Sequence, residues 1–272
     1  MLDLVTVGEA FDDFIFYNLD ALPAPGRELK TDAFVRTVGG GAVIAAIAAA
    51  RVGGIRCGIV SALSRDAAAR LRRHRIAVRN LRRGDEPIAL TVSLSTSRDR
   101  RFVTYTGGNV HLARRLRSVV PGLCGRHLHF AFDPGRCRPW VRILERLRGD
   151  GYGISWSFGW NPELRRDRDF GRLVDGLDYL FMNRDEARAY GCRPQRGLAV
   201  ITLGAAGVRA VGQRLDVRVP APRVRAIDTT GAGDVFAGAF LTARLRGEPL
   251  QRALRIGNRV AAASTRHPGG IA

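Results

Sequence analysis

The run that most limits how this 272-residue chain can fold is Asp228-Thr229-Thr230-Gly231-Ala232-Gly233-Asp234. An extended-looking stretch, 224–227, precedes it, and apolar residues follow it at helical spacing. The pattern predicts a strand end, a glycine-rich turn and the start of a helix. Small residues let a ligand approach the backbone, and N–H groups at a helix N-terminus attract phosphate. Asp234 would then be placed to take a proton from a hydroxyl that attacks a phosphoryl group.

The rest of the chain is typical of an α/β fold, because apolar strand-like runs alternate with helical segments. Such alternation predicts a mostly parallel sheet with helices on both faces, and ligands at the carboxyl ends of its strands. The length fits a single domain, 1–272. The expected strands are 1–8, 55–63, 128–132, 153–157, 177–181 and 198–203, and the expected helices are 42–52, 65–74, 139–148, 184–190 and 250–265.

Two early β-rich pieces, at about 12–36 and 86–108, do not follow this alternation. The second contains a strand pair, 88–95 and 101–106, with a turn expected at 97–100. The two pieces could form a small sheet that covers the site as a lid. The alternative is a pair of unconnected surface hairpins.

Composition excludes several classes of protein. The formal net charge is +19, but the basic residues are spread along the chain and only Lys30 is a lysine. Since no basic tail or aromatic–basic alternation accompanies them, we expect no nucleic-acid partner, although an anionic substrate would be attracted. No apolar run reaches the ~20 residues that a membrane helix needs, so a cytoplasmic protein without a membrane partner is expected. The four cysteines have no metal-ligand spacing.

The Asp228–Asp234 run closely resembles the C-terminal signature of the ribokinase-like sugar kinases, the PfkB family. The resemblance implies that Gly231, Ala232 and Gly233 form an anion hole and that Asp234 is the catalytic base. It also implies a three-layer α/β sandwich with a small β-sheet lid built from 12–36 and 86–108. No Walker Gly-x-x-x-x-Gly-Lys-Ser/Thr run is present. Taken alone, such residues could equally be a helix cap and a turn.

An N-terminal resemblance involves Gly39-Gly40-Gly41, which precedes an Ala-rich helix and follows Asp13. It implies that Asp13, Gly39 and Gly40 contact substrate, although a bare glycine run also suits a tight turn. Ile44 stands where the family usually has an Asn that bonds the sugar, and an alkyl group cannot replace that bond. Arg101, in the expected lid strand, is a further substrate candidate; a solvated strand face is the alternative.

The nucleotide side is implied by three further matches. Asn183-Arg184-Asp185-Glu186 matches the family's Asn-x-x-Glu, which orders Mg²⁺ through water, although the same tetrad is a good helix cap. Thr202, Gly204 and Gly207 resemble the family's Thr-x-Gly-x-x-Gly, and Asn258 matches a residue near the adenine pocket. Arg184 replaces the usual acidic residue after Asn183, and Ser157 lies where relatives often have Asp.

Asp228 and Thr230 match positions whose backbone oxygens hold a monovalent cation, such as K⁺, in some members of the family. Whether this chain depends on such a cation is left open.

The resemblance implies an ATP- and Mg²⁺-dependent phosphotransferase that phosphorylates a hydroxymethyl group of a sugar or sugar derivative. An alternative is a nucleoside kinase of the adenosine type, favoured by the aromatic residues Phe14, Phe16 and Tyr17. A second is a catalytically weakened ligand-binding or regulatory homologue, favoured by the three departures at Ile44, Ser157 and Arg184. Either way the expected partner is a small sugar or nucleoside, and the resemblance adds a homodimer formed through the lid.

Overall fold

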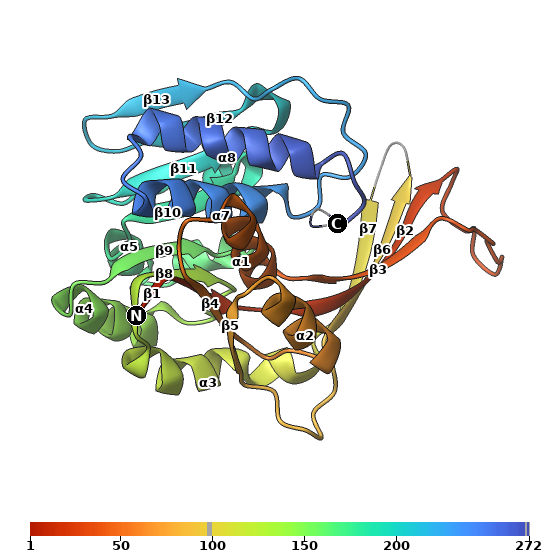
Figure 1. Ribbon diagram of the computed structural model, residues 1–272, viewed down its shortest axis with the longest axis horizontal. Helices are drawn as coiled ribbons and strands as arrows, with labels where there is room; N and C mark the ends of the chain where they lie inside the picture. Colours follow the sequence, from red (N-terminus) through yellow and green to blue (C-terminus); the bar gives the residue numbers. More distant parts are fainter. Residues whose placement is uncertain (97–99, 270, 272) are drawn as a thin grey trace.

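The structure, a computed structural model, describes residues 1–96, 100–269 and 271. Its centre is a nine-stranded sheet in the order β13-β12-β11-β10-β9-β8-β1-β4-β5 (Figure 1). All neighbouring pairs are parallel except β11–β12 and β12–β13. The strands are β1 (Leu2–Gly8), β4 (Cys57–Ser61), β5 (Ala77–Asn80), β8 (Gly125–Ala131), β9 (Gly153–Ser157), β10 (Tyr179–Asn183), β11 (Leu198–Thr202), β12 (Val208–Val211) and β13 (Asp216–Val219).

Helices cover both faces of this sheet and divide the core into two clusters. One face carries α1 (Gly41–Val52), α2 (Arg65–Arg73), α7 (Ala232–Leu245) and α8 (Leu250–Ser264). The other carries α3 (Leu112–Val119), α4 (Cys137–Gly149), α5 (Phe170–Asp175) and α6 (Arg184–Tyr190). This arrangement confirms the predicted α/β sandwich. No helix in the described part of the chain is long and apolar enough to cross a membrane.

A separate four-stranded sheet, called the small sheet below, projects from the body at the right of the view in Figure 1. It has the order β3-β2-β6-β7, with β2 (Phe11–Leu19), β3 (Phe34–Gly39), β6 (Leu90–Thr96) and β7 (Arg100–Tyr105). The two β-rich pieces therefore form one sheet rather than two unconnected hairpins. Of the turn expected at 97–100, residues 97–99 lie outside the described part.

Register divides the small sheet into two faces, because alternate residues of a strand point to opposite sides. Asp13 is opposite Thr37 and Thr91, and Ser95 is opposite Arg100, so these residues share one face. That inner face is packed against the body, since Ile15, Thr37, Ser93 and Ser95 are buried. The outer face carries exposed apolar groups: Phe34, Val103 and Tyr105.

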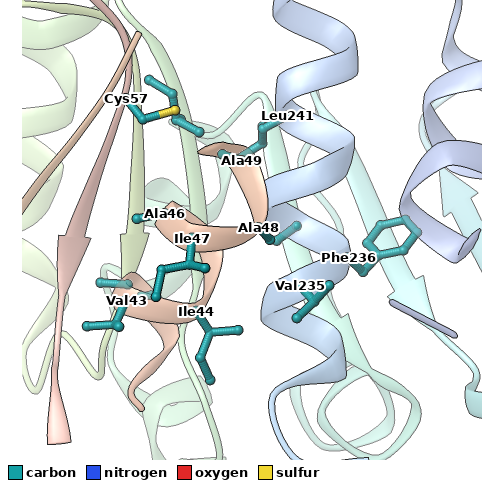
Figure 2. Close-up of a cluster of buried hydrophobic side chains, with 14 of the residues drawn as sticks. Val43, Ile44, Ala46, Ile47, Ala48, Ala49, Cys57, Val235, Phe236 and Leu241 are labelled. Carbon is teal, nitrogen blue, oxygen red and sulfur yellow. The ribbon is translucent and has the colours of Figure 1, made fainter. Parts of the chain in front are cut away.

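Helices α1 and α7 pack unusually close together, which brings their N-termini to one place. A Cβ on Gly238 would lie only 2.2 Å from the carbonyl oxygen of Ala45, so only glycine permits this contact. Ile44 and Ala48 lie on the side of α1 nearest to α7, which contributes Val235 (Figure 2). The Ala-rich sequence of α1 thus serves a close helix–helix contact as well as burial.

The strand expected at 224–227 is wrong: this stretch is irregular, and Val224 and Ile227 are exposed. The approach to the glycine-rich turn is fixed instead by the end of α8. The backbone N–H groups of Ile227 and Asp228 both donate to the carbonyl oxygen of Thr265, at 2.7 and 3.0 Å. The last strand before the turn is β13, in an antiparallel edge that the sequence did not reveal.

Candidate active site

The site lies at the carboxyl edge of the large sheet, beside β1. This is where the strand order reverses, since β4 and β5 follow on one side of β1 and β8 to β11 on the other. Open α/β sheets place ligands at such switch points. The N-terminus of α1 and that of α7 both meet this edge.

Asp234 stands in the first turn of α7, at the centre of the site. A Cβ on Gly41, the first residue of α1, would lie 2.9 Å from its Oδ1 and 3.0 Å from the Cβ of Ala131 at the end of β8. Burial raises the pKa of Asp234 to about 7, and the negative charge of Glu186 adds to the shift. A carboxylate with such a pKa is matched to accepting a proton near neutral pH.

The turn before α7 is held in one conformation by Ile44 and by its own backbone. Gly231 is the N-cap with φ +70°, and a Cβ there would lie 2.5 Å from Cδ1 of Ile44. The N–H of Ala232 donates to the carbonyl oxygen of Thr229 at 3.3 Å, so it is partly engaged within the turn. The N–H groups of the first helical turn lack acceptors one turn earlier in the helix, which leaves the end of α7 suited to an anion.

Asp228 holds this turn in place through hydrogen bonds to its carboxylate. Its carboxylate is 5% exposed and accepts hydrogen bonds from the backbone N–H of Thr230 at 2.8 Å and of Gly269 at 2.9 Å. Burial by itself would raise the pKa of Asp228, but the hydrogen bonds from Thr230 and Gly269 and the charge of Arg100 outweigh it and lower the pKa. Asp228 is therefore ionised throughout the neutral range.

Asp13 faces the site from the inner face of the small sheet. A Cβ on Gly39 would lie 1.8 Å from its Oδ2, so the carboxylate lies directly over the backbone of Gly39. Burial, followed by the charges of Asp12 and Asp228, raises the pKa of Asp13 to about 7. Asp12 points the other way, where it accepts from Ser64 Oγ at 2.7 Å.

Two acidic residues near the site were not found from the sequence. Glu9 directly follows β1, and burial together with the charge of Asp133 raises its pKa to about 6. Asp133 follows β8 and accepts from the amide nitrogen of Asn161 at 2.8 Å. The two become neighbours only because β1 and β8 pair in the sheet, which no local pattern reveals.

On the nucleotide side, Asn183 and Glu186 form a capping box at the start of α6. Asn183 Oδ1 accepts from the backbone N–H of Glu186 at 2.8 Å, and Glu186 Oε2 accepts from that of Asn183 at 2.8 Å. Asn183 and Glu186 therefore cap α6, as the alternative interpretation of this tetrad predicted. The negative charge of Glu186 nevertheless acts on Asp234 and adds to the rise of its pKa. Arg184, the departure from the family pattern, donates to the carbonyl oxygen of Leu203 at 3.1 Å.

The remaining nucleotide candidates lie on β11, α8 and the loop after β11. Thr202 ends β11 and its hydroxyl donates to the carbonyl oxygen of Met182 at 3.4 Å. Gly204 opens a short 3-10 turn that ends at Gly207. Asn258 is buried, and its amide nitrogen donates to the carbonyl oxygens of Val219 and Pro220 at 2.9 and 3.1 Å. Asn258 thus ties α8 to the end of β13, and its contact with a nucleotide stays a prediction.

Arg100, which was not among the predicted site residues, lies against the glycine-rich turn, whereas the contact of Arg101 with substrate stays a prediction. Arg100 Nη1 lies 3.1 Å from Asp228 Oδ1 and 2.8 Å from the hydroxyl of Thr230. Arg101 is exposed and, as the next residue of the same strand, belongs to the outer face.

The comparisons with known proteins agree with this geometry. Residues 160–272 match the family described as pfkB family carbohydrate kinase. A cytidine kinase from Thermococcus kodakarensis is 29% identical over 136 residues, 43% of this chain and 48% of the relative. A ribokinase from Bacillus subtilis is 44% identical over 101 residues, 34% of each chain. The chain thus spans less than half the length of each of these two relatives.

Among solved structures, a ribokinase from Cryptococcus neoformans var. grubii in complex with ADP superimposes with a TM-score of 0.79. The superposition covers 100% of this chain and 96% of that one, at 19% identity, and therefore shows the shared fold. Residues 160–272 thus resemble the pfkB family carbohydrate kinases, and the chain shares the fold of the solved ribokinase.

Proposed function

We propose that this protein transfers the γ-phosphoryl group of ATP to a hydroxymethyl group of a sugar or sugar derivative. The observation that carries the proposal is the placement of Asp234, a carboxylate with its pKa raised to about 7 at the anion-attracting end of α7. A base and an anion site side by side are what phosphoryl transfer to an alcohol requires. The ribokinase relative and the ADP complex of the structural neighbour support the same reaction.

In this proposal Asp234 accepts the proton of the attacking hydroxyl, and the turn stabilises charge on the transferring group. Backbone N–H groups at residues 231–233 supply fixed dipoles where negative charge develops, which costs no reorganisation during the reaction. Thr202, Gly204, Gly207 and Asn258 would hold the nucleotide at the neighbouring strand ends.

The residues present fit a magnesium ion held partly through phosphates and water. Glu186 offers carboxylate oxygen, the ligand type that Mg²⁺ prefers, and it lies close enough to Asp234 to raise its pKa. Within the described residues no three His, Cys, Asp or Glu side chains gather as a preformed metal site. Mg²⁺ bound near Asn183 and Glu186 would neutralise charge on the β- and γ-phosphates.

The acceptor side favours a polyhydroxylated molecule over a nucleoside. The inner face of the small sheet presents Asp13 together with hydroxyl side chains: Thr37, Thr91, Ser93 and Ser95. Of the three aromatic residues that favoured a nucleoside, Phe14, Phe16 and Tyr17, the first two lie on the outer face beside Phe34, with ring centroids 6.3 and 5.1 Å from it. Carboxylate and hydroxyl groups match sugar hydroxyls, so Asp13 with the Gly39–Gly40 turn is proposed to bind the acceptor.

The test is ADP release from Mg-ATP with a panel of pentoses, hexoses, sugar phosphates and nucleosides. We expect turnover with a neutral sugar or sugar derivative, and its loss by about 10³-fold or more in Asp234→Asn with ATP binding retained. Turnover with nucleosides alone would establish the nucleoside kinase. If no compound of the panel is phosphorylated although ATP still binds, the result would favour the ligand-binding homologue.

A further inference from the structure

The turn that presents the anion site contains a buried carboxylate whose charge must be balanced. Asp228 and Thr230 are the positions predicted to hold a monovalent cation in some members of the family. A cation held by the backbone oxygens of these two residues would lie beside the carboxylate of Asp228 and the hydroxyl of Thr230.

The side-chain oxygens beside that position are already engaged. Asp228 Oδ1 accepts from Arg100 Nη1 and from the N–H of Thr230, and Asp228 Oδ2 accepts from the N–H of Gly269. The hydroxyl of Thr230 accepts from the same Nη1 of Arg100 at 2.8 Å. A cation on the backbone oxygens of the same two residues would share the Asp228 carboxylate with a guanidinium about 3 Å from it, and the two positive charges would repel each other. The residues present therefore do not fit a monovalent cation.

Arginine is suited to this position because its guanidinium stays charged and its donors form a planar fork. One nitrogen reaches both the carboxylate and the hydroxyl, which joins two residues of the turn. Arg100 comes from the first residue of β7, more than a hundred residues earlier in the chain, so the contact also joins the small sheet to the turn.

A second contact also connects the small sheet to Asp228. Gly269, whose N–H holds Asp228, packs on the inner face of the small sheet. A Cβ on Gly269 would lie 3.0 Å from Thr37 Cγ2 and 3.1 Å from Ile15 Cδ1. The small sheet, the turn at Gly269 and the anion-binding turn therefore meet at Asp228.

We infer that Arg100 supplies the positive charge that a monovalent cation would otherwise supply, and that it is a positioning residue for the anion-binding turn. The protein then works equally well without K⁺, and the turn is ordered only while β7 is docked. The effect on turnover rests on the proposed function, whereas the effect on the turn does not.

The experiment compares wild type, Arg100→Gln and the control Arg209→Gln in KCl and in choline chloride of equal ionic strength. Arg209 also pairs with an aspartate, Asp216, but at the far edge of the large sheet. Hydrogen exchange of a peptide that covers residues 229–234 and the Tm are measured in both salts. Neither readout needs a substrate, so both remain informative if the panel of acceptors is silent.

We expect wild type and Arg209→Gln to exchange alike in the two salts and to keep the same Tm. Arg100→Gln should exchange at least about fivefold faster over 229–234 in choline, since local opening sets the exchange rate. K⁺ should slow that exchange again, because the vacated oxygens can then accept a cation. Arg100→Lys, which keeps a charge, should stay insensitive to K⁺ and serves if the Gln variant does not fold.

Three results would overturn the inference. One is a K⁺-specific slowing of exchange in wild type, which would show a real cation site beside Arg100. Another is unchanged exchange in Arg100→Gln, which would show that Arg100 does not position the turn. A third is faster exchange in that variant without any response to K⁺, which would leave Arg100 as an anchor but not as the substitute for a cation.

Discussion

Replacing Asp234 by Asn should stabilise the protein at neutral pH while it removes turnover. Burial raises the pKa of Asp234 from 3.8 to about 7, and each unit corresponds to about 1.4 kcal/mol, which gives an upper limit of about 4 kcal/mol. The native state binds this proton more tightly than the unfolded chain does. Stability is therefore lost as pH rises from about 4 to about 7 and is constant above that range.

Two effects reduce this figure. Asp234 is partly exposed, so water screens its charge. It also lies at the N-terminus of α7, where the helix dipole favours a negative charge by up to about 1 kcal/mol. We therefore expect the stability advantage of Asp234→Asn over wild type to grow by about 1 to 3 kcal/mol between pH 5 and pH 8.

Urea unfolding of both proteins at pH 5, 6, 7 and 8, without nucleotide, measures this difference. Asp20→Asn, which changes an exposed carboxylate after β2, is the matched control and should show no such growth. An advantage that is the same at pH 5 and pH 8, or a variant that is less stable at pH 8, would refute the argument that burial raises the pKa of Asp234.

The same pKa predicts that kcat falls as pH drops through about 7, because Asp234 must be ionised to accept a proton; a profile that is flat down to pH 5 would count against it as the base. Gly39→Ala would put a methyl group 1.8 Å from Asp13 Oδ2. The KM for the acceptor should then rise at least about tenfold with the KM for ATP unchanged, and equal changes in both would contradict the placement of Asp13. Gly231→Ala sets a Cβ 2.5 Å from Ile44 Cδ1 at φ +70°. It should cost about 1 to 3 kcal/mol in urea unfolding; an unaffected midpoint would show that the turn can relax.

The sequence predicted the fold because strand and helix periods are local. The alternation of apolar runs along the chain was enough for the large parallel sheet, which is confirmed. The wrong prediction of a strand at 224–227 also came from a local property of the sequence. Val224 and Ile227 have strand-forming side chains, but they are 42% and 57% exposed and meet no strand partner, which propensity alone does not reveal.

The parts of the candidate site that consist of consecutive residues could be predicted from the sequence. The parts that depend on which strands pair, and in which register, could not. The run 228–234 and the glycines at 39–41 mark their turns without any knowledge of the sheet. The sequence singled out Arg101 as a substrate candidate but not Arg100, which the structure brings to the glycine-rich turn. Because side chains alternate along a strand, a shift of one residue moves the guanidinium to the opposite face. Only the pairing of β6 with β7 decides between the two.

The acidic residues of the site also bear on the acceptor. Beside the proposed acceptor site, burial raises the pKa of both Glu9 and Asp13, and like charges add to the shift: Asp133 for Glu9, and Asp12 and Asp228 for Asp13. A phosphate already present on the acceptor would meet these like charges, and such juxtaposition costs several kcal/mol. In the acceptor panel we therefore expect a neutral sugar to give at least about tenfold higher kcat/KM than its phosphate ester. A preference for the phosphate ester would contradict this expectation. It would mean that cationic side chains contact the phosphate when the acceptor binds, and that the carboxylates contact only the hydroxyl groups of the acceptor.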